Sequence, residues 1–187
     1  LATACNVSRE TISRLEMFSD LLAAWSPRIN LVGKSQLTDL WRRHIWDSLQ
    51  LVALVNEPDC RWVDLGSGAG FPGLVIAIAM AGRPGFEMHL IESNKRKAGF
   101  LREAARITST PVEIHADRAD ALPYLGAQIM TARAFAPLPE LLELFDKHGA
   151  PGAVGLFLKG KGAASELTAS AASWSVEAQL IASRSDP

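Results

Sequence analysis

The 187-residue sequence has few cysteines, a single tyrosine, almost no net charge and no long hydrophobic run. Its two cysteines, Cys5 and Cys60, are too few for a disulfide framework or a zinc site, so we expect a reduced protein without a bound metal. A net charge of −1 gives no global basic field, so any nucleic-acid contact must use a local patch. The longest apolar stretch, Leu74–Ala81, is far shorter than the roughly 20 residues that cross a bilayer.

No signal peptide is visible, because the N-terminus lacks a basic segment leading into an apolar one. Together with the scarcity of cysteine, this predicts a cytoplasmic protein without membrane attachment. The apolar fraction of 48% and the charged fraction of 21% are ordinary for one globular domain. The chain starts at Leu1 without a methionine and stops at "SRSDP" after a strand-like segment, so both ends are expected to be incomplete.

The N-terminal third of the sequence has helical patterns. Residues Thr11–Trp25 place apolar side chains at three- and four-residue spacing, which predicts an amphipathic helix that Pro27 interrupts. A second helix is expected over residues 36–55. The sequence therefore predicts a helical N-terminal cap over residues 1–58, followed by a second unit over residues 59–187.

From residue 61 onward, β-rich runs alternate with helical patterns. Strands are expected at Arg61–Leu65, Met88–Glu92, Val112–His115, Ala127–Ala132 and Ala153–Leu158, and helices at Gly70–Ala81, Lys95–Ile107 and Leu138–His148. Strand, helix and strand in series predict a parallel sheet with right-handed crossovers, and hence a doubly wound α/β fold. Trp174–Ala182 is a candidate for a sixth strand.

The first expected strand runs into a glycine-rich turn and then a helix. The glycines Gly66, Gly68 and Gly70 let the backbone turn sharply and approach a ligand, which in such sheets lies beyond the carboxyl ends of the strands. Glu92 ends the second strand about 20 residues later, where a carboxylate can accept both hydroxyls of an adenosine ribose. No Gly-Lys-Ser/Thr follows the glycines, which excludes a P-loop and leaves NAD-type and S-adenosylmethionine-type cofactors.

Three features favour S-adenosylmethionine. Asp64, at the mouth of the first strand, would repel a pyrophosphate but suits a ligand that carries an ammonium and a sulfonium. Pro72 removes a backbone donor near the helix start that a pyrophosphate could use. The only tyrosine, Tyr124, has no lysine four residues later to help it act as the acid in hydride transfer. These features favour a methyltransferase, with an NAD(P)-dependent oxidoreductase and a non-catalytic RNA-binding module as alternatives.

Five blocks of sequence, "RHIWDSL", "VDLGSGAGFPG", "IESNKRKAGFLRE", "ARAFAPL" and "LKGKG", follow one another between roughly residues 30 and 162. In these blocks and their order the chain resembles the bacterial glucose-inhibited division protein B family, the small-subunit ribosomal RNA guanine-N7 methyltransferases. The resemblance implies a class I, Rossmann-like methyltransferase fold with S-adenosylmethionine as the donor. It also implies an acceptor, N7 of a guanine in the conserved loop of 16S rRNA near the decoding site. The expected partner is 16S rRNA or the small-subunit particle, and a monomer is expected.

The resemblance also implies roles for individual residues. Carried over by position, Gly66 and Phe71 line the cofactor, Ala119 and Asp120 flank the adenine, and Arg133 stands near the reacting end. The family's closing pair of strands is incomplete in this chain.

The absence of certain catalytic motifs from the sequence fits this chemistry. Guanine N7 carries a lone pair and no proton, so alignment with the sulfonium methyl and exclusion of water suffice, and no general base is expected. No Asn/Asp-Pro-Pro-aromatic motif follows the fourth strand, and Cys60 precedes the first strand, at the wrong end of the sheet. Arg133 is then expected to hold guanine O6, a phosphate or the methionine carboxylate.

Two groups are candidates for RNA contact. Lys159 and Lys161 follow the fifth strand at the sheet end that carries the glycine loop, where they could neutralise phosphates. The second group consists of Arg43, His44, Asp47 and Ser48. On a helix this group spans an arc of about 140° and either pins the cap or faces RNA, with the structural role favoured for the histidine. The RNA must be a loop or single strand, because the A-form major groove hides N7.

Overall fold

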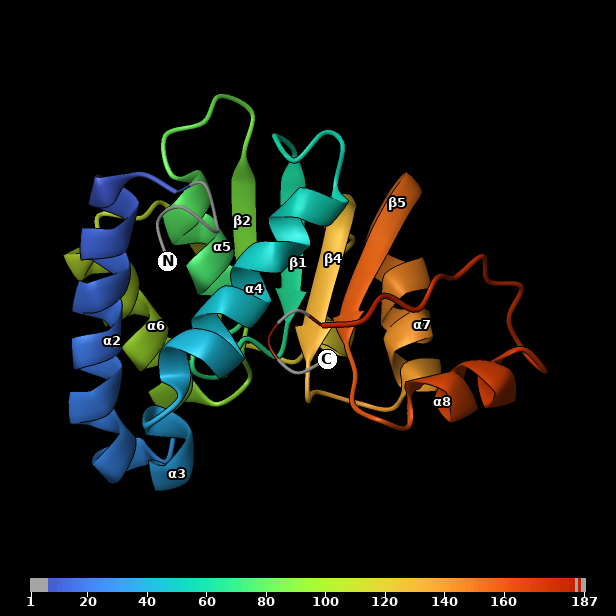
Figure 1. Cartoon of the computed structure of the whole chain (residues 1–187). Coiled ribbons are helices and arrows are strands. Elements are labelled where there is room, and N and C mark those ends of the chain that lie inside the picture. Colours follow the sequence, from blue (N-terminus) through green and yellow to red (C-terminus); the bar gives the residue numbers. More distant parts are fainter. Residues whose placement is uncertain (1–6, 184, 186–187) are drawn as a thin grey trace.

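The computed structural model describes residues 7–183 and 185, so Leu1, Cys5 and most of "SRSDP" lie outside the described residues. Five parallel strands form one sheet in the order β3-β2-β1-β4-β5 (Figure 1). They are β1 (Arg61–Leu65), β2 (Glu87–Ile91), β3 (Glu113–His115), β4 (Ala127–Arg133) and β5 (Gly149–Leu158). The chain first adds strands on one side of β1 and then returns to add β4 and β5 on the other. Doubly wound sheets bind ligands where this direction reverses.

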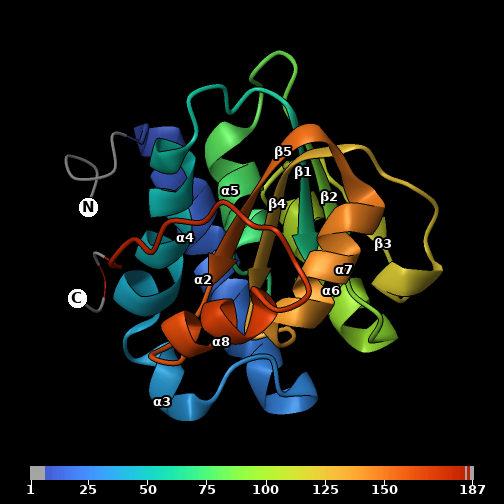
Figure 2. The same ribbon diagram turned by 90° about the vertical axis from the view of Figure 1, so that its right-hand side faces the viewer.

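Side chains alternate between the two faces along each strand, so the apolar strand residues need a covering layer on both faces. Helices provide it. One face packs against α2 (Arg9–Ile29), α4 (Asp47–Leu49), α5 (Gly73–Met80) and α6 (Lys95–Ile107). The other face packs against α7 (Leu138–His148), beside which lies α8 (Ala163–Ser170). Figure 2 shows α2, α4 and α5 on one side of the strands and α7 on the other. The predicted doubly wound α/β class is confirmed.

The N-terminal helices share one hydrophobic core with the sheet. The Phe18 ring of α2 is fully buried, with its centroid 5.5 Å from that of Phe71 and 6.2 Å from that of Phe100 in α6. Truncating such a ring to alanine costs about 3–5 kcal/mol. The cap is thus packed into the body of the molecule, and the boundary at residue 58 stays a prediction.

Several element boundaries agree with the sequence patterns. β1, α6 and α7 have the predicted limits, and the other four strands overlap their predicted ranges. Helix α5 begins at Gly73 rather than at Gly70, because residues 66–72 form the turn that leads from β1. Across the described residues, none of the helices combines the length and the apolar character that a membrane span requires.

The predicted interruption at Pro27 is wrong. Helix α2 continues to Ile29 and ends at Asn30, whose left-handed conformation (φ 51°) and N–H bond to Ser26 O form the C-cap. Pro27 lies in the last turn, so its missing N–H removes one hydrogen bond near the helix end rather than in the middle.

The predicted single helix over residues 36–55 is also wrong. The segment is α3 (Lys34–Leu37), a π-helical turn η1 (Trp41–Trp46), α4 and a 3₁₀ segment η2 (Gln50–Leu54). Leu40 and Ile45 are both buried although they are five residues apart, a spacing that suits i→i+5 hydrogen bonding. The π turn therefore lets both side chains reach the core.

The predicted strand at Trp174–Ala182 is not formed. This segment has no regular structure, and Leu180 and Ile181 are more than half exposed. The alternation of apolar residues is insufficient without a neighbouring strand and a surface to pack on. The segment instead leads to Ser183, which contacts Asp47 of the N-terminal helices.

Candidate active site

A cavity of about 630 Å³ lies at the carboxyl end of the sheet, where the strand order reverses. Its volume is typical of small-molecule sites, which span about 300–1,000 Å³. One wall comprises the glycine turn and the segments that follow β2 and β3, and the other comprises η1, the end of β4 and the residues after it. The cavity-lining residues used below are Gly66, Gly68, Phe71, Glu92, Arg118, Ala119, Asp120, His44, Arg133 and Phe135.

Gly66 allows an aromatic ring to lie directly on the turn. Its φ is +66°, and a Cβ at this position would lie 2.1 Å from Cδ2 of Phe135. The chain brings Phe135 back over the turn through Ala134, a non-glycine residue with a φ of 47°. The sequence analysis did not single out Phe135, although the "ARAFAPL" block contains it. Its ring is 42% exposed and forms part of the cavity wall.

Asp64 lies beneath the turn rather than on the cavity wall. The carboxylate is fully buried and accepts hydrogen bonds from Thr131 Oγ1 (2.6 Å) and from the Gly73 amide (3.2 Å). Burial raises its pKa to about 6, and these hydrogen bonds oppose the rise. A Cβ at Gly73 would lie 2.5 Å from Asp64 Oδ2, so only glycine fits there.

The position of Asp64 corrects the direct ligand contact expected for it, but it supports the choice of cofactor class. Its carboxylate occupies the N-terminus of α5, where dinucleotide-binding folds place the pyrophosphate. Gly70 also lies off the cavity wall, because a Cβ there would meet Leu74 and Phe18. Asp64 and Gly70 therefore support the conformation of the turn without lining the cavity.

Glu92 follows β2 and reaches the cavity, as expected. Its side chain is held by two backbone amides: Oε2 accepts from Gly68 N–H (2.9 Å) and Oε1 from Asn94 N–H (2.7 Å). The residue is only 7% exposed. Each carboxylate oxygen has a second acceptor direction, so Glu92 can still accept two hydroxyl groups of a ligand.

Ala119 and Asp120 lie together on the wall after β3, in the short η3 helix (Ala119–Ala121). Arg118 binds the Asp120 carboxylate with two hydrogen bonds of 3.0 and 2.9 Å, which lower the Asp120 pKa. The buried His148 ring contacts Ala119 O through Nε2 at 2.9 Å and supports this segment from below. Arg118 is a cavity residue that the sequence analysis missed.

His44 reaches the cavity from the π turn. Its ring stacks on Phe71 with centroids 4.9 Å apart, which joins η1 to the glycine turn. Burial, followed by the nearby Arg133 cation, lowers the His44 pKa to about 4, so the ring is neutral at pH 7. Within the described residues neither ring nitrogen has a hydrogen-bond partner, although both are buried. The ring thus packs as a structural group while it presents unsatisfied polar atoms.

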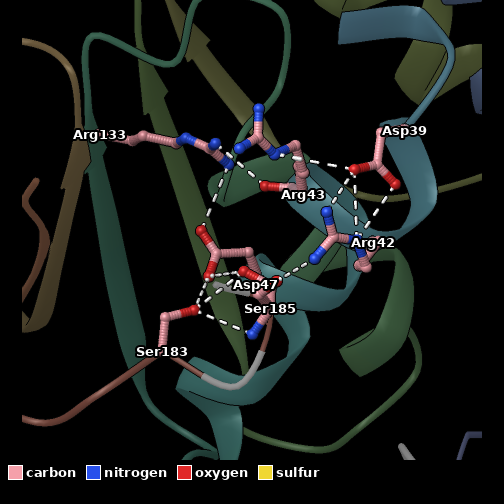
Figure 3. A network of polar contacts seen from close by, with 7 residues as sticks. All are labelled: Asp39, Arg42, Arg43, Asp47, Arg133, Ser183 and Ser185. Carbon is pink, nitrogen blue, oxygen red and sulfur yellow. Dashed lines mark hydrogen bonds and ion pairs between the residues drawn. The ribbon is translucent and has the colours of Figure 1, made fainter. Parts of the chain in front are cut away.

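Arg133 is the last residue of β4, and its side chain meets the same helical turn. Its Nη2 donates to Arg43 O (3.0 Å), and its Nη1 lies 3.6 Å from Asp47 Oδ2, an ion pair beyond hydrogen-bond length (Figure 3). Burial lowers the Arg133 pKa and the Asp47 carboxylate opposes this, but a guanidinium stays charged. Nη1 is buried and makes no hydrogen bond to any part of the chain that the structure describes.

Asp47 connects this site to the C-terminal segment. Its Oδ1 accepts hydrogen bonds from Ser183 Oγ (2.7 Å) and Ser185 Oγ (2.8 Å), while Oδ2 faces Arg133 (Figure 3). Oδ1 also accepts a hydrogen bond from Gln50 Nε2 (2.7 Å). Segments more than 130 residues apart in sequence therefore fix one carboxylate. Helical spacing predicts that Asp47 lies near Arg43, but no local pattern links it to Arg133 or to the C-terminal serines.

The residues predicted to contact RNA are dispersed. Lys159 donates to Ala136 O and pairs with Glu166, both at 2.8 Å, and its side chain is only 17% exposed. Lys161 is exposed in the turn after β5. Arg43 is exposed and lies 3.7 Å from Asp39, while His44 faces the cavity. The structure thus brings His44 to the cavity and leaves Lys161 and Arg43 on the surface.

Solved structures show which fold this chain shares. A SAM-dependent O-methyltransferase from Thermotoga maritima superposes with a TM-score of 0.57 at 13% identity, over 72% of this chain and 52% of that one. A SAM-dependent methyltransferase from Aquifex aeolicus gives a TM-score of 0.50 at 14% identity, over 64% and 69%. The fold is that of the class I S-adenosylmethionine-dependent methyltransferases, as predicted.

Sequence comparison defines the family within that class. A family model described as rRNA small subunit methyltransferase G matches residues 11–184. Two proteins named ribosomal RNA small subunit methyltransferase G are each 51% identical to this chain. The alignment with the protein from Paramagnetospirillum magneticum covers 100% of this chain and 89% of the relative, and that with the protein from Rhodospirillum rubrum covers 97% and 88%. The chain belongs to the rRNA small subunit methyltransferase G family, which confirms the resemblance.

Proposed function

We propose that this chain transfers a methyl group from S-adenosylmethionine to N7 of a guanine in the conserved loop of 16S rRNA near the decoding site. Family membership sets the reaction class and favours it over an NAD(P)-dependent oxidoreductase. The observation that carries the proposal is the cavity between two unlike walls. One wall presents a fixed carboxylate, and the other presents an arginine and a neutral histidine with buried polar atoms that make no hydrogen bond to the described residues.

The first wall fits the adenosyl part of the cofactor. Glu92 would accept the ribose hydroxyls, because both of its oxygens are oriented by backbone amides and retain acceptor capacity. Ala119 and Asp120 would flank the adenine, and Gly66, Gly68 and Phe71 would line the remainder of the ligand. Asp64 positions the turn through Gly73 and leaves no vacant helix terminus for a pyrophosphate.

The second wall fits the acceptor base. Bound S-adenosylmethionine supplies an electrophilic methyl group, and guanine N7 needs no general base. Arg133 would donate through Nη1 to guanine O6 or to a phosphate. His44 would offer one ring N–H and one acceptor nitrogen to the base or to its backbone. Phe135 would shield the reacting atoms from water, because its ring covers the glycine turn.

The RNA would approach the rim of the cavity. Arg43 and Lys161 are the exposed cations that we assign to phosphate contact, whereas Lys159 has a structural role through Glu166. Binding should then weaken as salt rises, in proportion to the phosphates that are neutralised. We place the protein in the cytoplasm, where its RNA substrate is found, and a monomer remains our prediction.

The direct test is methyl transfer from isotope-labelled S-adenosylmethionine to small ribosomal subunits from cells that lack this gene. We expect one label per 16S rRNA, which mass mapping places on N7 of a guanine in the decoding-region loop. Parallel reactions with naked 16S rRNA and with assembled particles identify the substrate form. Absence of label, as a non-catalytic RNA-binding module would give, or label on another atom, would contradict the proposal.

A further inference from the structure

A second cluster of reactive side chains lies away from the cavity, on the edge of the sheet. His89 of β2 and Glu113 and His115 of β3 point to the sheet face that carries Ile91. Residues 116–126, which join β3 to β4, contain only η3, so no long crossover helix covers this part of the face. At this edge the Glu113 side chain is exposed, and the two histidine side chains are mostly buried beside it.

The three side chains form a compact triangle. His89 Nδ1 lies 3.1 Å from His115 Nε2. Glu113 Oε2 lies 3.5 Å from His89 Nδ1, and Glu113 Oε1 lies 3.6 Å from His115 Nε2. Zinc ligands about 2.0–2.1 Å from the metal at tetrahedral angles are roughly 3.4 Å apart. The separation of the two histidine nitrogens is close to one edge of a tetrahedral ligand set. The two Glu113 distances belong to different carboxylate oxygens; with one oxygen as the ligand, the three ligand atoms lie within 4.8 Å of one another, and a rotation of the exposed Glu113 side chain would complete the set.

The kinds of ligand and their exposure also suit a metal ion. Two imidazoles and one carboxylate are a common set for Zn²⁺ with an open fourth position. The two histidine side chains are 12% and 15% exposed, which restricts their motion, while Glu113 is 64% exposed and leaves an entry path. The strand register sets this arrangement, because His89 pairs with Glu113 and Ile91 pairs with His115.

We propose that His89, Glu113 and His115 bind a divalent transition-metal ion of the Zn²⁺ type, which joins β3 to β2. The scarcity of cysteine led us to expect no bound metal. The proposed site uses histidine and glutamate instead, and strand pairing brings these residues together. β3 is a short strand at the sheet edge, so a metal shared with β2 would stabilise it. The site is next to the cavity wall, because the Glu92 amide donates to His115 O at 3.0 Å.

The test is metal binding to the full chain, free of affinity-tag histidines. Co²⁺ reports the geometry through the intense visible bands of a tetrahedral complex, and calorimetry with Zn²⁺ gives the affinity and stoichiometry. We expect one ion per chain and a rise in Tm with Zn²⁺. Glu113→Gln and His115→Gln should each weaken Zn²⁺ binding by more than about tenfold, which is a conservative figure for the loss of a direct ligand.

Glu87→Gln is the matched control, since Glu87 is an exposed carboxylate on the same edge region that pairs with Arg61 instead. This variant should bind Zn²⁺ as the unsubstituted protein does. Circular dichroism without metal verifies that each variant is folded, and the exposed Glu113 makes its variant the least disruptive. The proposal is overturned if the folded protein binds no Zn²⁺ at micromolar concentrations, or if Glu113→Gln and Glu87→Gln bind it equally well.

Discussion

The two walls of the cavity differ in how their polar groups are satisfied. On the sheet side, Glu92 is held by two backbone amides, and beneath this wall the buried Asp64 is held by Thr131 and Gly73. On the cap side, both nitrogens of His44 and Nη1 of Arg133 are buried without hydrogen bonds inside the described ranges 7–183 and 185. Leaving such groups unpaired costs about 1–3 kcal/mol each.

Under the proposed function, this difference would separate two roles within one cavity. A preorganised wall binds a ligand of constant structure without rearrangement, which suits the cofactor. A wall with unpaired donors and acceptors gains its hydrogen bonds only when a second ligand arrives, which suits the RNA base. We therefore expect changes in the sheet wall to alter stability and cofactor affinity, and changes in the cap wall to alter methyl transfer.

The largest effect is expected for Asp64→Asn. The folded-state pKa of Asp64 is raised from 3.8 to about 6, so its contribution to stability is complete below pH 4 and is lost as the pH rises through 6. The shift corresponds to about 3 kcal/mol of unfolding free energy between these limits. The asparagine variant should lack this decline when urea unfolding is measured at pH 4 and pH 7.5. Equal pH dependence in both proteins would contradict the buried, satisfied position of Asp64.

The next effect is expected for Glu92→Gln. Glutamine has a single acceptor atom at its end, so one of the two amides, Gly68 N–H or Asn94 N–H, loses its partner. Loss of hydrogen bonds to a charged group should weaken S-adenosylhomocysteine binding by about 1.5–3 kcal/mol, or roughly 10- to 150-fold, by calorimetry. Glu87→Gln, whose carboxylate pairs with Arg61, is the control and should bind normally. Wild-type affinity of Glu92→Gln for S-adenosylhomocysteine would contradict the role of Glu92 in cofactor binding.

Arg133→Ala tests the second wall. We expect methyl transfer to small-subunit RNA to fall at least about tenfold, which corresponds to 1.4 kcal/mol, while the circular dichroism spectrum is unchanged. S-adenosylhomocysteine affinity should change less than turnover does. Asp47→Asn, which keeps the size of the side chain but removes the charge 3.6 Å from Nη1, should give a smaller loss. Near-normal turnover of Arg133→Ala would refute the positioning role.

The smallest change is expected for His44→Phe, and its comparison with His44→Ala is informative. Alanine removes the stack on Phe71 and should lower Tm more than it lowers RNA affinity. Phenylalanine keeps a stacked ring without unpaired nitrogens, so the free energy of unfolding of this variant should equal that of the wild type or exceed it by up to about 1 kcal/mol. Its methyl transfer should nevertheless decrease. Wild-type methyl transfer by the phenylalanine variant would show that His44 contributes to packing and not to the reaction.

The sequence predicted those features that depend on local pattern. The limits of β1, α6 and α7 follow from apolar periodicity, and Glu92 follows from its distance to the glycine turn. The π turn could not be predicted, because it depends on where the core requires Leu40 and Ile45. The failure at Pro27 has a similar cause, since a helix tolerates proline when its end lies one turn away.

Site features that depend on tertiary contacts were not predictable. Asp64 was placed at the cavity because it precedes the turn by two residues, yet the N-terminus of α5 draws its carboxylate beneath the turn. The link from Arg133 to Asp47, and from Asp47 to Ser183, joins segments with no local relationship. His89 and His115 are 26 residues apart and meet only through the register of β2 and β3.

The most direct measurement of the central claim is a crystal structure of this chain with bound S-adenosylhomocysteine. We predict that both ribose hydroxyls lie within hydrogen-bond distance of Glu92 and that the homocysteine sulfur faces the side of the cavity formed by His44 and Arg133. A ribose bound away from Glu92, or a sulfur directed toward Asp120 and away from the cap, would contradict the assignment of the two walls.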